Sequence, residues 1–193
     1  MSAVARMRAD AVPEVETAVL DRARRGDHEA FAIVVRHYDP QLRALAYRLL
    51  GSRDRMDDAL QEAYVKAFRA LPRFRGQSQL GTWLHRIVFN ACLDELGRLR
   101  RAEAVPLEDA PEPVAPGPDH GDLLAGREQL SDALATLAPH DRAAVLLIDS
   151  QGFDYAAAAE VLGIPPGTVA SRLNRARAAL RRALGESVKG VAQ

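Results

Sequence analysis

The sequence predicts an all-α protein with two small helical domains joined by a flexible, acidic, proline-rich linker. Apolar residues recur at helical spacing through nearly all of the chain. No segment shows the two-residue alternation or the Asn-Gly turn that would indicate a β-hairpin. Residues 102–126 contain six acids, five of the eleven prolines and no lysine or arginine, a composition that forms neither a helix nor a core. This stretch therefore divides the chain.

The composition as a whole is that of a globular protein. The chain has 193 residues, 48% hydrophobic and 27% charged, which is enough for two small cores. No stretch approaches the roughly 20 apolar residues that span a bilayer, and the N-terminus lacks the apolar core of a secretion signal. The single cysteine, Cys92, excludes an internal disulfide and a cysteine-rich zinc site. We therefore expect a cytoplasmic protein.

The net charge of zero conceals an uneven distribution. Residues 14–101 carry 16 basic and 12 acidic groups, and residues 127–193 carry eight basic and seven acidic groups. The acidic linker thus masks two mildly basic modules, a balance that is compatible with binding to nucleic acid.

The N-terminal domain, residues 14–101, is predicted to contain four helices. Their expected ranges are 15–25, 27–50, 54–71 and 81–101. Gly26 and Gly51 end the first two, because glycine readily takes the positive φ found at helix C-termini. Asp27 is placed to cap the second helix, and Pro72 stops the third.

The C-terminal domain, residues 127–186, is predicted to end in a helix-turn-helix. Two helices are expected first, over 127–137 and 140–150. The small residues 156–162 then suit a helix that another crosses closely, and Gly163 permits a sharp turn. Two prolines precede a fresh helix start, and an arginine-rich helix follows over 169–184.

The last helix presents an exposed face suited to a DNA groove. This face carries Thr168, Ser171, Arg172 and Arg175. Five arginines and no acid lie between Pro165 and Leu184, and Arg177 and Arg181 among them are candidate phosphate anchors. An arginine-rich amphipathic helix is also often no more than a solvated surface.

The predicted third helix has a second distinctive face. Its outward side carries Asp58, Gln61 and Glu62 around an exposed Val65. Carboxylates repel phosphate, so this mixture suits a polar protein interface with a small apolar centre better than it suits DNA. An ordinary solvated helix face is the alternative.

The loop at residues 74–80 and the helix after it can accept a base turned out of the DNA stack. A polar, glycine-containing loop lies there beside an apolar wall, and the amide of Asn90 can read a base edge. Candidate DNA-contacting residues on this helix are Leu80, Arg86, Asn90, Arg98, Arg100 and Arg101. Trp83 is more typical of a core residue than of a stacking platform, and Asn90 can instead cap a neighbouring loop.

Three ordered motifs in this chain resemble the extracytoplasmic-function group of bacterial RNA polymerase sigma factors, within the sigma-70 superfamily. They are DDALQEAYVKAFRAL at 57–71, FRGQSQLGTWLHRIVFNACLDELGRLRR at 74–101 and GIPPGTVASRLNRARAAL at 163–180. The resemblance covers about residues 18–101 and 127–185. Three motifs in this order are far more specific than any one of them.

The resemblance implies a role for each candidate site. Asp58, Gln61 and Glu62 match the segment that docks on the clamp helices of the largest subunit of core RNA polymerase. Leu80 and Asn90 match positions lining the pocket for a flipped base of the −10 element. Thr168, Ser171, Arg172 and Arg175 match the helix that enters the major groove at the −35 element.

The resemblance also implies partners. They are core RNA polymerase, including the upstream-contacting part of its second-largest subunit, promoter DNA and an anti-sigma factor that covers the polymerase-binding faces. The linker would pass toward the RNA exit path. No small-molecule substrate, metal or cofactor is implied, and the protein would not be an enzyme.

Two other classes of protein compete with a sigma factor. An activator or repressor with one helix-turn-helix would need neither the acidic third-helix face nor the base-accepting loop. An enzyme using Cys92 or one of the five histidines has little support, because Cys92 lies on an apolar-rich helix with no spaced histidine partner. No glycine-rich phosphate loop or metal-ligand spacing is present either.

Overall fold

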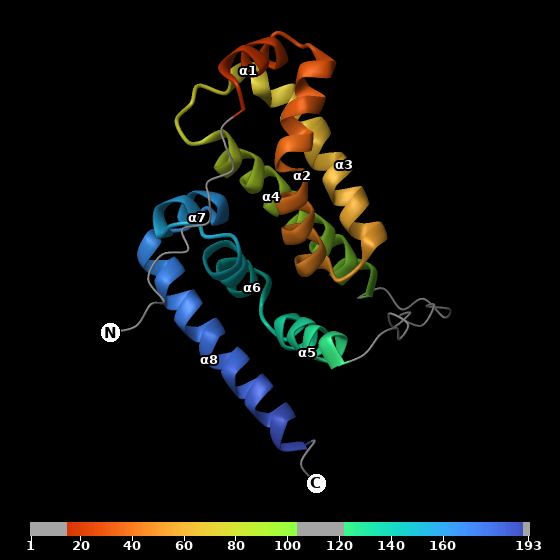
Figure 1. Cartoon of the computed structure of the whole chain (residues 1–193), viewed down its shortest axis with the longest axis vertical. Helices are drawn as coiled ribbons and strands as arrows, with labels where there is room; N and C mark the ends of the chain where they lie inside the picture. Colours follow the sequence, from red (N-terminus) through yellow and green to blue (C-terminus); the bar gives the residue numbers. More distant parts are fainter. Residues whose placement is uncertain (1–14, 104–121, 191–193) are drawn as a thin grey trace.

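The computed structural model describes residues 15–103 and 122–190, and every regular element in those ranges is helical. The prediction of an all-α fold is thereby confirmed. Figure 1 shows the two helical domains side by side. The N-terminal domain comprises α1 (Thr17–Arg24), α2 (His28–Leu50), α3 (Arg53–Ala70), the 3-10 turn η1 (Leu71–Arg73) and α4 (Leu80–Glu103). The C-terminal domain comprises α5 (Asp122–Ala135), α6 (Pro139–Val145), the π-helical turn η2 (Leu146–Ser150), α7 (Tyr155–Leu162) and α8 (Pro166–Gly190).

Local capping explains where the helices begin and end. The carboxylate of Asp27 accepts the backbone N–H groups of Glu29 and Ala30, each at 3.0 Å, and so satisfies two donors at the start of α2. Gly51 and Gly163 close α2 and α7 with φ of 68° and 65°, a region in which a side chain would be strained.

The core of the N-terminal domain forms where α2, α3 and α4 pack together. Its largest fully buried apolar side chains are Val34, Leu42, Leu45, Leu49, Leu60, Leu71, Leu84, Val88 and Phe89. Small residues on α3, including Ala59 and Ala63, let this helix approach its neighbours closely.

The predicted linker is too long at its C-terminal end. Residues 104–121 of the predicted 102–126 lie outside the described residues, but α5 already begins at Asp122 and α4 continues to Glu103. The sequence from Asp122 to Ala125 contains two leucines and an alanine, which favour a helix. The composition of the whole stretch hid this local preference.

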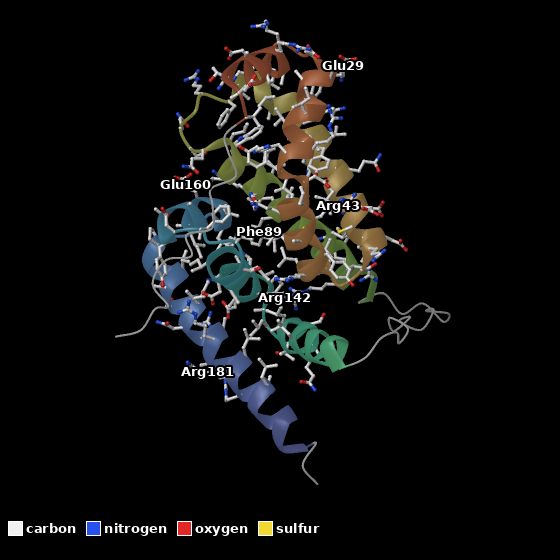
Figure 2. All side chains as sticks on the ribbon, in the orientation of Figure 1. Glu29, Arg43, Phe89, Arg142, Glu160 and Arg181 are labelled. Atoms are coloured by element: carbon white, nitrogen blue, oxygen red, sulfur yellow. The ribbon has the colours of Figure 1, made fainter. Side chains whose placement is uncertain are left out.

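The two domains pack against each other, an arrangement that the sequence did not predict. Helix α7 lies against α4, and α5 and α6 lie against α2. The buried residues form one core cluster that extends through both domains. Figure 2 shows Phe89 and Arg142 between them.

Aromatic rings from α4 meet the C-terminal domain at the interface between the two domains, which we call the seam. The ring of Phe89 meets that of His140 edge-on at 5.4 Å between centroids, and His85 meets Phe153 at 4.8 Å. His85 is 1% exposed, and its Nδ1 lies 2.7 Å from the carbonyl of Gly81. Burial lowers the pKa of His85, so the neutral ring is favoured in this position.

Polar contacts complete the seam. Arg142 donates to the carbonyl oxygens of Leu49 at 2.9 Å and of Arg48 at 3.4 Å, at the C-terminus of α2. The amide of Gln151 donates to the carbonyl of Gln41 at 2.8 Å. Helix C-termini carry unpaired carbonyls and partial negative charge, which a guanidinium satisfies well.

Candidate nucleic-acid and protein interfaces

Helices α7 and α8 form the predicted helix-turn-helix. The turn begins at Gly163, and the backbone N–H of Thr168 donates to the carbonyl of Pro165 at 2.9 Å as α8 starts. Val169 and Leu173, on the inner side of α8, are fully buried. Ser171 and Arg175 are exposed, whereas Thr168 and Arg172 are half-buried, so all four predicted residues lie on or beside the open face of α8.

A buried carboxylate that the sequence did not reveal lies under this face. Asp141, near the start of α6, accepts from Nε and Nη2 of Arg175, each at 2.9 Å. Its Oδ1 also lies 3.8 Å from Nη1 of Arg172. The carboxylate raises the pKa of the Arg175 guanidinium through this hydrogen bond. Arg175 is therefore not a free cation, as the sequence suggested, but one half of a fixed ion pair.

The two predicted phosphate anchors differ in their surroundings. Arg177 forms a bidentate ion pair with Asp149 of η2, in which Nε of Arg177 lies 3.0 Å from Oδ2 of Asp149. Arg181 is exposed on α8, where Figure 2 labels it. Of the two, Arg181 is the better placed to reach a phosphate.

The outward face of α3 has the exposure that its spacing predicted. Asp58 and Gln61 are exposed, and Val65 is 45% exposed. Glu62 is half-buried because it takes part in a network of charges. Asp58, Gln61 and Val65 therefore form the accessible part of this face.

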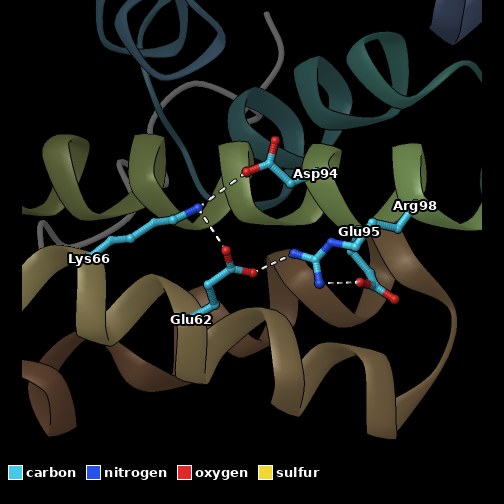
Figure 3. A network of polar contacts seen from close by, with 5 residues as sticks. All are labelled: Glu62, Lys66, Asp94, Glu95 and Arg98. Atoms are coloured by element: carbon cyan, nitrogen blue, oxygen red, sulfur yellow. Dashed lines mark hydrogen bonds and ion pairs between the residues drawn. The ribbon is translucent and has the colours of Figure 1, made fainter.

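Figure 3 shows that the Glu62 network joins α3 to α4. Its carboxylate lies 3.0 Å from Nζ of Lys66 and 2.5 Å from Nη2 of Arg98. Lys66 and Arg98, in that order, lower the pKa of Glu62. Asp94 and Glu95 of α4 complete the network, each 3.2 Å from a cation. The structure thus pairs Glu62, a predicted polymerase contact, with Arg98, a predicted DNA contact, so Arg98 is not the free cation that the sequence suggested.

An apolar groove of about 790 Å³ lies beside the α3 face, between α2 and α3. Phe31, Tyr64, Val65 and Phe68 line it, and His28 stacks on Phe68 with 4.6 Å between ring centroids. Helical spacing places Tyr64 and Phe68 on the inner side of α3 with the buried Ala63 and Ala67, but both aromatic residues are only half-buried. Helical spacing gives the direction of a side chain and does not say whether a neighbour covers it.

The loop before α4 borders an open hollow of about 470 Å³. Loop residues 76–80 line it together with Arg24, Tyr38 and Phe74. Arg24 fixes the loop by donating from Nη2 to the carbonyl of Phe74 at 3.1 Å, with its guanidinium 5.5 Å from the ring centroid. Arg24 lies 50 residues before Phe74, so no sequence pattern pointed to it.

Leu80 lines this hollow and Asn90 does not, so the shared base pocket implied by the resemblance stays a prediction. Ten residues of helix place them about 15 Å apart along α4, and Asn90 does not line the hollow beside Leu80. Leu80 is buried at 9% exposure, whereas Asn90 is exposed. Arg86 and Arg101 are also exposed, on the same side of α4 as Asn90.

Two further features of α4 bear on the predicted chemistry. Arg100 is exposed near its end, and Trp83 is half-buried with its ring 5.1 Å from that of Phe74. Trp83 therefore supports the wall of the loop. An exposed stripe of polar side chains along α4 thus starts beside the hollow and runs toward Arg101.

The described part of the chain offers no clear site for a metal or a reactive thiol. No group of three or more His, Cys, Asp or Glu side chains in these residues is placed to bind a metal ion. Cys92 is fully buried, and burial raises its pKa to about 12, so the reactive thiolate is strongly disfavoured. Among the described helices, none combines the length and the apolar character that crossing a membrane requires.

Two protein families match this chain in order. Sigma-70 region 2 matches residues 34–102, and Sigma-70 region 4 matches residues 127–180. The first match covers the seam-facing α4 and most of the N-terminal domain. The second covers the helix-turn-helix.

Several curated relatives match over most of their length. The ECF RNA polymerase sigma factor SigM of Mycobacterium tuberculosis is 41% identical over 166 residues, which cover 86% of this chain and 83% of that protein. The RNA polymerase sigma-H factor of Pseudomonas aeruginosa is 34% identical over 182 residues, covering 89% and 94%. The ECF RNA polymerase sigma-E factor of Escherichia coli is 32% identical over 175 residues, covering 84% and 90%.

Two solved structures share the fold. CnrH in complex with the cytosolic domain of CnrY matches with a TM-score of 0.66 and 27% identity, over 88% of this chain and 96% of that one. The sigma factor RpoE of Bartonella quintana, in complex with the anti-sigma factor NepR, matches with a TM-score of 0.65 and 31% identity, over 80% and 96%. With both sigma-70 domains present in sequence order and ECF sigma factors among relatives that are 32% to 41% identical, the chain belongs to the extracytoplasmic-function sigma factors.

Proposed function

We propose that this protein is a dissociable transcription initiation factor. It binds core RNA polymerase, directs it to promoters through a −10 and a −35 element, and is restrained by an anti-sigma factor. One observation carries the proposal: a single chain combines a sigma-70 region 2 domain with an exposed polar α3 face and a region 4 domain with an exposed α8 face. The protein acts in the cytoplasm, where its polymerase and DNA are, and promotes strand opening by binding rather than by covalent chemistry.

A conventional helix-turn-helix regulator is the second candidate, but the N-terminal domain argues against it. Such a regulator needs no exposed acidic helix face and no loop that borders a hollow of about 470 Å³ beside a DNA-facing helix. The proposal therefore depends on whether the α3 face binds polymerase.

Asp58 and Gln61 offer the clearest test of that face. Both are exposed on α3, next to the exposed apolar Val65. Glu62 is a poorer target, because its removal would also leave Lys66 and Arg98 without their carboxylate. The double change Asp58→Ala, Gln61→Ala leaves this network in place.

We expect the Asp58→Ala, Gln61→Ala variant to bind core polymerase at least tenfold more weakly than wild type. Loss of two polar contacts at an interface, one of them made by a charged group, typically costs on the order of 2 kcal/mol or more in total, which exceeds the roughly 1.4 kcal/mol of a tenfold change. Titration of core enzyme with the labelled full-length chain measures the Kd. Transcription by the reconstituted holoenzyme, followed by sequencing of the transcript starts, reports promoter selection.

Glu160→Ala is the matched control, since Glu160 is an exposed acid on α7 in the other domain. It should leave the affinity for core polymerase unchanged. If the double variant bound core polymerase as tightly as this control, the interface assignment would be wrong.

The apolar groove suggests where an anti-sigma factor acts. Both solved relatives described above were determined with a second protein, the cytosolic domain of CnrY in one case and NepR in the other. The groove between α2 and α3 shares Gln61 and Val65 with the α3 face. An amphipathic helix laid into it would therefore exclude polymerase.

Replacing His28 by aspartate should weaken that inhibitory contact about tenfold. His28 is exposed, stacks on Phe68 in the groove and lies at the end of α2 away from Asp58, so polymerase binding should be preserved. The anti-sigma factor is first isolated through its binding to the wild-type chain. Its inhibition of transcription is then measured for holoenzyme that contains the wild type or the variant. Full inhibition of the variant would place the inhibitor elsewhere.

A further inference from the structure

The recognition face of α8 rests on one buried acid. Asp141 is 7% exposed and lies two residues after Pro139, the first residue of α6, where the partial positive charge of a helix N-terminus stabilises a carboxylate. It is 34 residues from Arg175 in the sequence. The α6–α8 packing brings its carboxylate under two of the four predicted −35 contacts.

The geometry leaves part of Arg175 available. Asp141 engages its Nε and Nη2 atoms at 2.9 Å each, so the other edge of the guanidinium, between Nη1 and Nη2, still carries donors. The Arg175 side chain is 65% exposed, compared with 10% for that of Asp141. A guanidinium bound along one edge and open along the other cannot rotate freely, and its open edge has the spacing that guanine O6 and N7 accept.

A second ion pair also connects α8 to a neighbouring segment. Arg177 forms a bidentate pair with Asp149, as Arg175 does with Asp141. Two residues along a helix is a rotation of about 200°, so Arg177 points away from the face that carries Arg175. Asp149 therefore braces α8 without reaching the recognition face, whereas the Asp141 pair ends on it.

We propose that Asp141 is a positioning residue for promoter recognition, which fixes Arg175 so that its open edge reads a guanine of the −35 element, with Arg172 held beside it. The inference rests on the proposed function. The carboxylate has a second effect, because its negative charge opposes DNA phosphates. Asp141 thus favours the correct sequence and disfavours DNA in general.

These two effects give Asp141→Asn an unusual expected result. The asparagine retains one acceptor oxygen but loses the charge and the second acceptor of the fork. Binding to DNA of random sequence should be unchanged or up to threefold tighter, while the preference for the −35 sequence falls about tenfold. A residue that only stabilised the fold would lower both affinities together.

The experiment uses the full-length chain in holoenzyme. Wild type first selects −35 sequences from a randomised duplex pool, and Kd values are then measured for the selected duplex and a random one of equal length. Asp149→Asn is the matched control and should keep the wild-type ratio of the two Kd values. A ratio for Asp141→Asn within twofold of wild type, or an equal fall in both variants, would overturn the inference.

Arg175→Lys provides a second variant should Asp141→Asn fold poorly. Lysine keeps the positive charge but cannot form two parallel hydrogen bonds, and the exposed position should tolerate it. It should lose the preference for the same guanine, and an unchanged preference would also overturn the inference. A wild-type holoenzyme that selects no sequence at all would instead overturn the proposed function.

Discussion

Replacement of Phe89 by alanine is expected to lower the free energy of unfolding by about 3–5 kcal/mol. Phe89 is completely buried and lies on the side of α4 that meets the C-terminal domain, edge-on to His140. Removing its ring leaves a cavity bordered by both domains, which neither can close without moving relative to the other. For a chain of this size, that loss corresponds to a fall in Tm of roughly 10 °C. Urea and thermal unfolding measure both quantities.

Two further variants test whether the cavity accounts for the loss of stability in Phe89→Ala. Phe89→Leu should cost less than about 1.5 kcal/mol, because it preserves most of the volume. Phe153→Ala removes a half-buried ring across the same seam and should cost less than Phe89→Ala. A loss below about 1 kcal/mol for Phe89→Ala would contradict this account of the seam.

The helices were predictable because the signals that define them are local. Asp27 caps α2 from one residue before it, and Gly51 and Gly163 supply positive φ at the positions where helices end. Apolar spacing along α3 and α8 gave their buried faces in the same way. The exposed residues Asp58, Gln61 and Ser171 followed from these faces, although their binding roles remain predictions.

The partners of the charged residues were not predictable, because they come from distant parts of the chain. Asp141 is 34 residues from Arg175, and Glu62 is 36 residues from Arg98. Only packing decides that these cations meet carboxylates. The number of arginines on α8 was therefore a poor guide to how many remain free to contact DNA.

Leu80 and Asn90 differ in their surroundings. Ten residues on a straight helix place them about 15 Å apart, and of the two only Leu80 lines the hollow beside the loop. That both residues contact one flipped base is implied by the resemblance and stays a prediction. The loop around Gly76 remains the better candidate for accepting a base, because it lines the hollow beside Leu80.

Arg142→Ala should release the two domains from each other. Arg142 is half-buried, and burial lowers the pKa of its guanidinium. It donates to carbonyls of Arg48 and Leu49 in α2 and to those of Ala135 and Leu137 at the end of α5, the last two at 2.6 and 3.2 Å. Only the bonds to Arg48 and Leu49 join the two domains, and two hydrogen bonds from one half-buried charged group are worth about 2 kcal/mol together. We expect the radius of gyration, about 16 Å for a compact chain of this length, to rise by several ångströms in solution scattering.

The release should also affect polymerase binding. The proposed function places the two domains on separate promoter elements, and modules two helical turns apart on DNA are separated by about 70 Å. This exceeds the width of a compact chain with a radius of gyration near 16 Å, so the proposed function requires the docked domains to separate on a promoter. Separating the docked domains takes free energy that weakens the binding of wild type to core polymerase. If the domains of Arg142→Ala are already separated, this variant should bind core polymerase up to about tenfold more tightly.

Gln151→Ala also tests the separation of the domains. The side-chain amide of Gln151 donates across the seam to the carbonyl oxygen of Gln41, so its loss should leave the packing within the C-terminal domain in place. This variant should expand the chain less than Arg142→Ala and change affinity in the same direction. Arg36→Ala, an exposed change on α2, should do neither. If both seam variants kept the wild-type radius of gyration, Arg142 would not be what holds the domains together. If they expanded without binding core polymerase more tightly, separation of the domains would not limit assembly of the holoenzyme.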